Sequence, residues 1–158
     1  MTDRAASLTH RVKEGLRPMT GALTGHCLCG AVAITALSHA DAVSACHCSM
    51  CRRWSGAAMW VLEAPVESVE VAGPVQHYRS SSFAERAWCG ACGTQLWIKD
   101  DDGPYELMPG LFDDPRSLPL SHEIYIDQAF TSVMLAGEHK RVTRVEYEAS
   151  ERAVPNRL

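Results

Sequence analysis

The 158-residue sequence has no long apolar run, no excess of positive charge and no low-complexity tract. A membrane-spanning helix needs about 20 consecutive apolar residues, so we expect no membrane partner. The formal net charge of −4 argues against general electrostatic binding to nucleic acid. The first 18 residues also lack the apolar core of a secretory signal. We therefore expect a single globular domain in the reducing cytoplasm, with neither nucleic acid nor a membrane as partner.

The sequence also lacks an even number of cysteines, which excludes a complete set of disulfides. Its seven cysteines fall into three tight groups, and none stands alone: Cys27 and Cys29; Cys46, Cys48 and Cys51; Cys89 and Cys92. Buried free cysteines that serve only as small apolar residues would be scattered. The grouping therefore favours zinc, with one closed site of four thiolates and one site of three ligands and an open position.

The glycines indicate which cysteines share a site. Gly30 and Gly93 follow CLC and CGAC, where a turn around a metal needs a positive φ. These two matching turns predict a structural zinc site made by Cys27, Cys29, Cys89 and Cys92. An alternative joins Cys48 and Cys51 to Cys89 and Cys92, as in a zinc ribbon, but leaves three cysteines without a site.

Most of the remaining sequence predicts strands, because short runs rich in β-branched and aromatic residues alternate with turn formers. We expect strands over 31–37, 57–62, 68–73, 75–80, 94–99, 105–110, 122–126 and 132–137. Helices are predicted over 3–16, 49–54 and 143–153, the last with Thr143 and Glu146 spaced as a capping box. The fold class is thus mainly β, with antiparallel sheets packed around zinc knuckles and a few short helices.

Composition changes near Pro18, and we expect the chain to divide into three parts. Residues 1–18 are expected to be an N-terminal extension, flexible or a single helix. Residues 19–150 form the zinc-binding domain, and residues 151–158 form a C-terminal tail.

Five segments together resemble the glutathione-dependent formaldehyde-activating enzyme family, which includes centromere protein V. They are GHCLCGAV, CHCSMCRRWSGAAMWV, CGACGTQLW, GLFDDP and HEIYIDQAF, within residues 21–148. The resemblance implies a β-tent fold, a structural zinc at Cys27, Cys29, Cys89 and Cys92, and a catalytic zinc at Cys46, Cys48 and Cys51. It also implies a carbon–sulfur lyase-type activity on S-hydroxymethylglutathione, formed from formaldehyde and glutathione.

Three thiolates on Zn²⁺ leave a net charge of −1 and one vacant position. Such a soft site suits a substrate thiol as its fourth ligand, or an oxygen to be polarised. We therefore expect a small-molecule thiol or thiol–aldehyde adduct as the partner, with glutathione as one candidate. The alternative is a non-catalytic zinc-binding interaction module of the same fold, in which His47 or another buried histidine would close the second site. Alternation along the chain points His47 away from the cysteine side chains, however.

Arg52 and Arg53 are the candidate cations near the three thiolates. The sequence does not indicate the oligomeric state.

Overall fold

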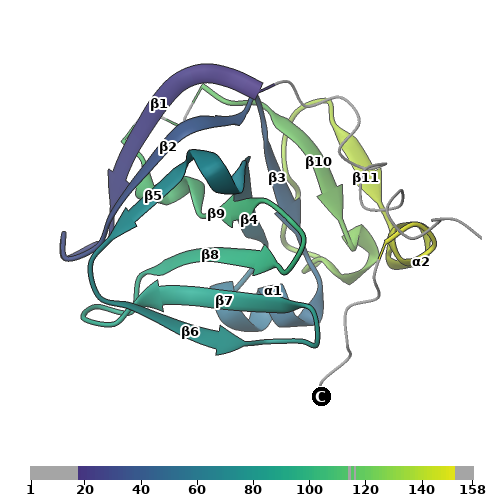
Figure 1. The fold of residues 1–158 in the computed structure, drawn as a ribbon. Helices are drawn as coiled ribbons and strands as arrows, with labels where there is room; N and C mark the ends of the chain where they lie inside the picture. Colours follow the sequence, from purple (N-terminus) through teal and green to yellow (C-terminus); the bar gives the residue numbers. More distant parts are fainter. Residues whose placement is uncertain (1–17, 114, 116, 152–158) are drawn as a thin grey trace, which may run out of the picture.

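The computed structural model describes residues 18–113, 115 and 117–151 (Figure 1). Eleven strands dominate this part of the chain. Their bounds are β1 Pro18–His26, β2 Ala33–Ala40, β3 Val43–Cys46, β4 Met59–Ala64, β5 Val69–Ala72, β6 Val75–Arg79, β7 Ala84–Cys89, β8 Gln95–Asp100, β9 Tyr105–Leu107, β10 Leu120–Ile124 and β11 Lys140–Val142. The helices are α1 Ser49–Ser55 and α2 Arg144–Glu148, with 3-10 turns at Val66–Ser68, Pro109–Leu111 and Ile126–Gln128.

The strands form two sheets, which Figure 1 shows with β1, β2 and β5 at the upper left. The smaller sheet has the order β1-β2-β5, and the larger has the order β11-β10-β3-β4-β9-β8-β7-β6. The main core lies between the smaller sheet and the central strands of the larger one, where Ile34 of β2 and Leu62 of β4 are fully buried. At the edge of this core, Gly25 of β1 bridges to Phe112.

Strand β4 shows how the larger sheet separates a core face from a cavity face. Successive side chains of a strand point to opposite faces. Leu62 and Ala64 pack into the main core, whereas Met59 and Val61 join a second apolar cluster that contains three cysteines. Glu63 follows the same alternation and lines the cavity beside that cluster. The sheet is therefore covered by the main core on one face and borders a cavity on the other.

The mainly β fold with short helices is confirmed, and seven of the expected strands overlap β2, β4, β5, β6, β8, β9 and β10. Most neighbouring strands pair antiparallel, as expected, and β10 differs because it runs parallel to both β3 and β11. The strand expected over 132–137 is absent. Strand β11 takes the edge beside β10 instead, and Met134 is 91% exposed, so this apolar run has no sheet to pack against.

Both short helices expected near the cysteines and the C-terminus are present. Cys48 caps α1, because its Sγ accepts a hydrogen bond from the Cys51 N–H at 3.4 Å. Thr143 caps α2 in a complete capping box with Glu146, although α2 is shorter than expected. The helix expected over 3–16 lies outside the described residues. Within the described ranges, no helix has the length and apolar character needed to cross a membrane.

Candidate metal centres and the adjoining cavity

The fold brings Cys27, Cys29, Cys89 and Cys92 together, with their four Sγ atoms all within 4.8 Å of one another. The Sγ of Cys29 lies 3.5 Å from that of Cys27 and 3.9 Å from that of Cys89. A tetrahedral zinc with Zn–S distances of about 2.3 Å requires sulfurs about 3.8 Å apart. The cluster therefore fits a zinc ion. The alternative set with Cys48 and Cys51 is not assembled, since these two lie in a separate cluster.

Two matching turns present these four sulfurs. The N–H of Gly30 bonds to the Cys27 carbonyl and the N–H of Gly93 to the Cys89 carbonyl, both at 2.9 Å, and both glycines have a φ of 76°. Thr94 links the turns, because its Oγ1 accepts the Leu28 N–H at 3.0 Å and lies 3.1 Å from the Cys92 Sγ. This hydroxyl lowers the pKa of Cys92 to about 5, which favours the thiolate that a metal requires.

The second cluster comprises Cys46 at the end of β3, Cys48 at the cap of α1 and Cys51 within α1, and all three are buried. Their Sγ atoms also lie within 4.8 Å of one another. Hydrogen bonds from the Cys46 and Cys51 thiols lower the pKa of Cys48 to about 3, and the shared contact with Cys48 raises the pKa of Cys46. Three thiolates so close together repel one another, so a bound cation is needed to hold them all deprotonated.

A buried arginine lies against this cluster. The Nη2 of Arg86, on β7, lies 3.6 Å from the Cys51 Sγ, and its Nη1 lies 3.4 Å from the Met59 Sδ. Its guanidinium stacks over the Trp54 ring at 4.8 Å, and the residue is only 6% exposed. A fixed positive charge thus offsets part of the thiolate charge. Trp54 also packs against the cluster, and so shields it from water.

The two arginines proposed from sequence do not take this role. The Nε of Arg52 bonds to the His47 carbonyl at 2.9 Å, and its guanidinium lies over the Phe130 ring. Arg53 lines a separate groove with Trp54, Tyr78 and other residues. Sequence reasoning missed Arg86 because β7 was not recognised as a strand. The small alanines of AERAWC give a weak strand signal, although the alternation of the segment was visible.

His47 points away from the sulfurs, as the alternation predicted. Its Nε2 lies 2.6 Å from Glu123 Oε2, and the other carboxylate oxygen contacts the Nε2 of His139 and the Nε of Arg141. Burial alone would raise the pKa of Glu123, but the hydrogen bonds from His139 and His47 outweigh burial and lower it. His47 is therefore held as a partner of Glu123 beside the three-cysteine cluster.

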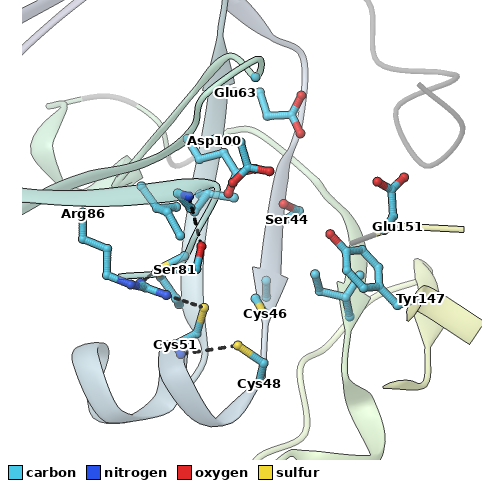
Figure 2. A pocket seen from close by; sticks show the side chains of 18 of the residues that line it. Ser44, Cys46, Cys48, Cys51, Glu63, Ser81, Arg86, Asp100, Tyr147 and Glu151 are labelled. Atoms are coloured by element: carbon cyan, nitrogen blue, oxygen red, sulfur yellow. Dashed lines mark hydrogen bonds between the residues drawn. The ribbon is translucent and has the colours of Figure 1, made fainter. Parts of the chain in front are cut away.

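A cavity of about 140 Å³ opens beside the three cysteines (Figure 2). Apolar walls come from Met59, Val61 and Ile124. Tyr147 of α2 also lines it, with its hydroxyl toward the cavity in Figure 2. Burial, together with the charges of Glu106 and Cys46, raises the pKa of this phenol. Tyr147 therefore stays protonated and can donate a hydrogen bond to a ligand.

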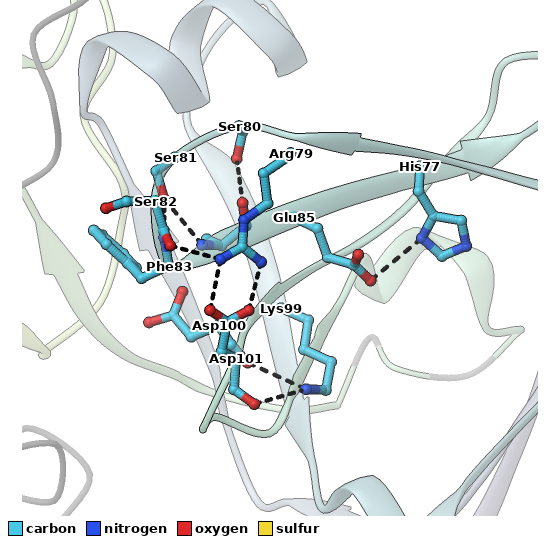
Figure 3. Close-up of polar contacts among 11 residues, drawn as sticks. His77, Arg79, Ser80, Ser81, Ser82, Phe83, Glu85, Lys99, Asp100 and Asp101 are labelled. Atoms are coloured by element: carbon cyan, nitrogen blue, oxygen red, sulfur yellow. Dashed lines mark hydrogen bonds and ion pairs between the residues drawn. The ribbon is translucent and has the colours of Figure 1, made fainter.

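The rim of the cavity is fixed by ion pairing between two neighbouring turns (Figure 3). Arg79 at the end of β6 forms a two-pronged pair with Asp101, with its Nη2 at 2.6 Å from Oδ2. The same Nη2 donates to the Ser82 carbonyl at 2.6 Å, and the Asp101 N–H bonds to the Phe83 carbonyl at 2.9 Å. These bonds hold the turn after β6 against the turn after β8, where both border the cavity.

The chain is similar in sequence to known proteins. The sequence matches the family model of the glutathione-dependent formaldehyde-activating enzyme over residues 22–128. It is 34% identical over 106 residues to an uncharacterized lyase of Schizosaccharomyces pombe, covering 65% of this chain and 77% of that protein. It is 30% identical over 97 residues to a Halomonas elongata protein named after the same family, covering 55% of this chain and 62% of that protein.

A crystal structure of a Rhodobacter sphaeroides protein is also similar, with a TM-score of 0.48 and 22% identity over 63% of this chain and all of that chain. The family match includes both cysteine clusters and the strands between them. The chain belongs to the glutathione-dependent formaldehyde-activating enzyme family.

Proposed function

We propose that the protein is a zinc-dependent carbon–sulfur lyase-type enzyme that acts on a thiol–aldehyde adduct of the S-hydroxymethylglutathione kind. One observation carries this proposal: three buried sulfurs lie at a cavity, and no fourth His, Cys or carboxylate of the described residues joins them. A structural zinc site is normally closed by four protein ligands, whereas three ligands leave a position for a substrate. The family match and a relative named as a lyase support the same class of reaction.

The two clusters take different roles in this proposal. Cys27, Cys29, Cys89 and Cys92 would hold a structural zinc that joins the β1–β2 turn to the β7–β8 turn. Cys46, Cys48 and Cys51 would hold the catalytic zinc, which supplies a Lewis acid for the sulfur or oxygen of the adduct. The reducing cytoplasm, which keeps these thiols free of disulfides, is the compartment we propose.

The reaction breaks the carbon–sulfur bond of an S-hydroxymethyl thiol. The bonding electron pair goes to sulfur, the hydroxyl oxygen loses its proton as the aldehyde forms, and the sulfur leaves as a thiol. Tyr147 can donate a hydrogen bond to the oxygen or to the departing sulfur within the cavity. Arg86 limits the negative charge that accumulates on Cys51, and Met59 and Val61 exclude water from one wall.

Cobalt substitution combined with an adduct assay tests this proposal. The cobalt spectrum of the three-cysteine site should change when millimolar thiol is added, and the protein should consume the S-hydroxymethyl adduct in an NMR assay. Apparent thiol binding should tighten as pH rises toward the pKa of the thiol, because ligation releases its proton. Cys48→Ser should abolish both the spectral change and the consumption of adduct.

The four-cysteine cluster serves as the internal control, since it should show no response to thiols. X-ray absorption at the zinc edge adds an independent measurement: two zincs, one with four sulfurs and one with three sulfurs and a lighter atom, are expected. A cobalt spectrum that stays fixed with both thiols and aldehyde would instead favour a non-catalytic zinc-binding interaction module.

A further inference from the structure

Ser81, in the turn between β6 and β7, places a buried hydroxyl at the wall of the cavity beside the three cysteines. The residue is only 6% exposed and lines that cavity. Figure 2 shows it on the wall that also carries Arg86, whose guanidinium contacts the Cys51 sulfur. Ser81 therefore adds a polar group to the space in which the oxygen of a thiol–aldehyde adduct would have to lie.

Both lone pairs of the Ser81 hydroxyl are already used. Its Oγ accepts a hydrogen bond from the Ala84 N–H at 3.0 Å and a longer one from the Phe83 N–H at 3.3 Å. A serine hydroxyl has two acceptor positions and one hydrogen to donate. Ser81 can therefore meet a ligand as a hydrogen-bond donor, and not as an acceptor.

The hydrogen of this hydroxyl has no acceptor among the residues that the structure describes, since neither bond of the Ser81 Oγ uses it. The neighbouring hydroxyl of Ser80 differs, because it donates to the Ala84 carbonyl at 3.3 Å and Ser80 lines the separate groove beside Trp54. Buried polar groups of folded proteins are nearly always hydrogen-bonded. The remaining donor of Ser81 thus calls for an acceptor inside the cavity.

Backbone bonds hold the turn that carries Ser81 in place. The N–H groups of Ser80 and Ser81 both donate to the Ala84 carbonyl, at 3.0 and 3.2 Å. The ion pair of Arg79 with Asp101 fixes the same turn to the turn after β8. A donor that is fixed before the ligand arrives needs no reorganisation during the reaction, which is the property of a group that stabilises a developing oxyanion.

We propose that Ser81 is a catalytic residue of the lyase-type reaction, and that its hydroxyl donates a hydrogen bond to the oxygen of the thiol–aldehyde adduct. The inference rests on the proposed function and adds the residue that holds the adduct's oxygen. This oxygen is bonded to the same carbon as the sulfur, so it lies beside the three cysteines when the sulfur does. The site should therefore distinguish ligands with an oxygen on that carbon from thiols that lack one.

The hydrogen bond from Ser81 strengthens as the carbon–sulfur bond breaks. The oxygen of the adduct loses its proton and carries negative charge until the carbon–oxygen double bond forms. The electron pair of the carbon–sulfur bond moves to sulfur, which takes up one proton and leaves as a thiol, so no oxidant or reductant is needed. A fixed hydroxyl donor stabilises the oxygen when its charge is largest.

Two sulfur ligands of nearly equal size test this contact. Thioacetate has an oxygen on the carbon bonded to sulfur, whereas ethanethiol has none. Each is titrated into the cobalt-substituted protein, with the spectrum of the three-cysteine site as the readout. The ratio of thioacetate to ethanethiol affinity should fall about tenfold in Ser81→Ala, because the variant removes a hydrogen bond to an oxygen that shares negative charge. Ser81→Thr keeps a hydroxyl and should retain most of the ratio.

Ser80→Ala is the matched control, because it removes a buried hydroxyl of the same turn that lines the separate groove instead. Its affinity ratio should equal that of the wild type. In the adduct assay, kcat should fall about tenfold to hundredfold in Ser81→Ala, while the affinity for ethanethiol stays unchanged.

Each variant is first checked for the metal content of the wild type. If Ser81→Ala loses metal, a measurement on the wild-type protein takes its place: the carbon–oxygen stretch of bound thioacetate. A hydrogen bond to the oxygen should lower its frequency below that of a zinc–thioacetate complex without a donor.

The outcomes separate the two proposals. If neither ligand changes the cobalt spectrum of the wild type, the proposed function itself fails, and the role of Ser81 fails with it. If both ligands bind but Ser81→Ala and Ser80→Ala have the same affinity ratio, the role of Ser81 is overturned while the open metal site stands. An equal loss of affinity for both ligands in Ser81→Ala, or a carbon–oxygen stretch that matches the complex without a donor, would overturn it as well.

Discussion

The Nε2 atom of His47 lies 2.6 Å from the Oε2 atom of Glu123, and each side chain is 1% exposed. His47 lies between Cys46 and Cys48 of the three-cysteine cluster. Glu123 belongs to strand β10, which runs parallel to β3. This buried contact therefore ties the segment from Cys46 to Cys48 to the sheet. It also explains why His47 is not grouped with the three sulfurs of Cys46, Cys48 and Cys51.

Glu123→Gln should destabilise the protein by about 3 kcal/mol, because it removes the charge that two buried histidines and Arg141 share. Thermal or urea unfolding of the metal-loaded protein measures the change. Glu70→Gln, at an exposed position on β5, is the matched control and should change stability by less than about 0.5 kcal/mol. Equal effects of the two substitutions would show that the contacts of Glu123 with His47, His139 and Arg141 add nothing to stability.

The same carboxylate predicts a pH dependence. Because the pKa of Glu123 is lower in the folded protein, the unfolded chain binds its proton more readily. The stability that Glu123 contributes is complete above the ordinary glutamate pKa of about 4.3 and is lost as pH falls through the lower folded pKa. Acid also protonates the cysteines, but it does so equally in the wild type and in the Glu123→Gln variant. The stability difference between wild type and Glu123→Gln should therefore shrink below about pH 4.3.

The two cysteine clusters should differ in their effect on folding. We expect Cys27→Ser and Cys89→Ser to give insoluble or partly unfolded protein, because a structural zinc supplies folding free energy directly. Cys48→Ser should leave a folded chain with one zinc fewer. Melting temperatures and zinc content per chain measure both effects. Equal destabilisation by Cys48→Ser and Cys89→Ser would contradict the division into structural and catalytic sites.

The local parts of the fold and site were predictable from sequence, because their signals lie within a few residues. Cysteine spacing, the glycines after each pair and the capping box at Thr143 all act locally. The parallel pairing of β10 with β3 joins segments about 80 residues apart, and no turn signal records it. Arg86 of β7 is a second example, since its neighbour Cys51 lies 35 residues away in α1 and only the tertiary fold brings them together.

Gly25→Ala should destabilise the protein by about 1 to 3 kcal/mol through overpacking. An added Cβ at Gly25 would lie 2.4 Å from the backbone oxygen of Leu111, at the bridge between β1 and Phe112. Gly21→Ala, in the same strand, meets nothing within 4 Å and is the matched control. A similar loss of melting temperature in both variants would show that glycine itself, rather than the close approach, sets the stability of β1.

Arg86→Met should weaken metal binding at the three-cysteine site by about tenfold, since residues that support metal ligands typically contribute this much. The apolar replacement keeps the packing against Trp54 but removes the charge beside Cys51. Arg86→Lys should restore part of the affinity. Competition with a chelator measures this effect, and the four-cysteine site should be unaffected. A loss of affinity at both sites would indicate general unfolding.

We propose that the folded domain needs none of residues 1–17, because both cysteine clusters and the main core are built from later residues. Deletion of residues 1–17 should leave the melting temperature and zinc content nearly unchanged. Deletion of residues 1–26 is the contrasting variant, because it also removes β1 from the smaller sheet. A large loss of stability or a change of oligomeric state after the shorter deletion would show that the extension packs on the domain.

The two clusters also differ in how far apart their ligands lie along the chain. Cys29 and Cys89 are separated by 60 residues, whereas Cys46, Cys48 and Cys51 lie within a single short segment. The entropy of closing a loop grows with its length, so the short segment can capture a metal before the chain has folded. The four-cysteine site must wait until both turns have been synthesised and brought together. When zinc is scarce during synthesis, we therefore expect the three-cysteine cluster to bind zinc first and the four-cysteine cluster to bind it last.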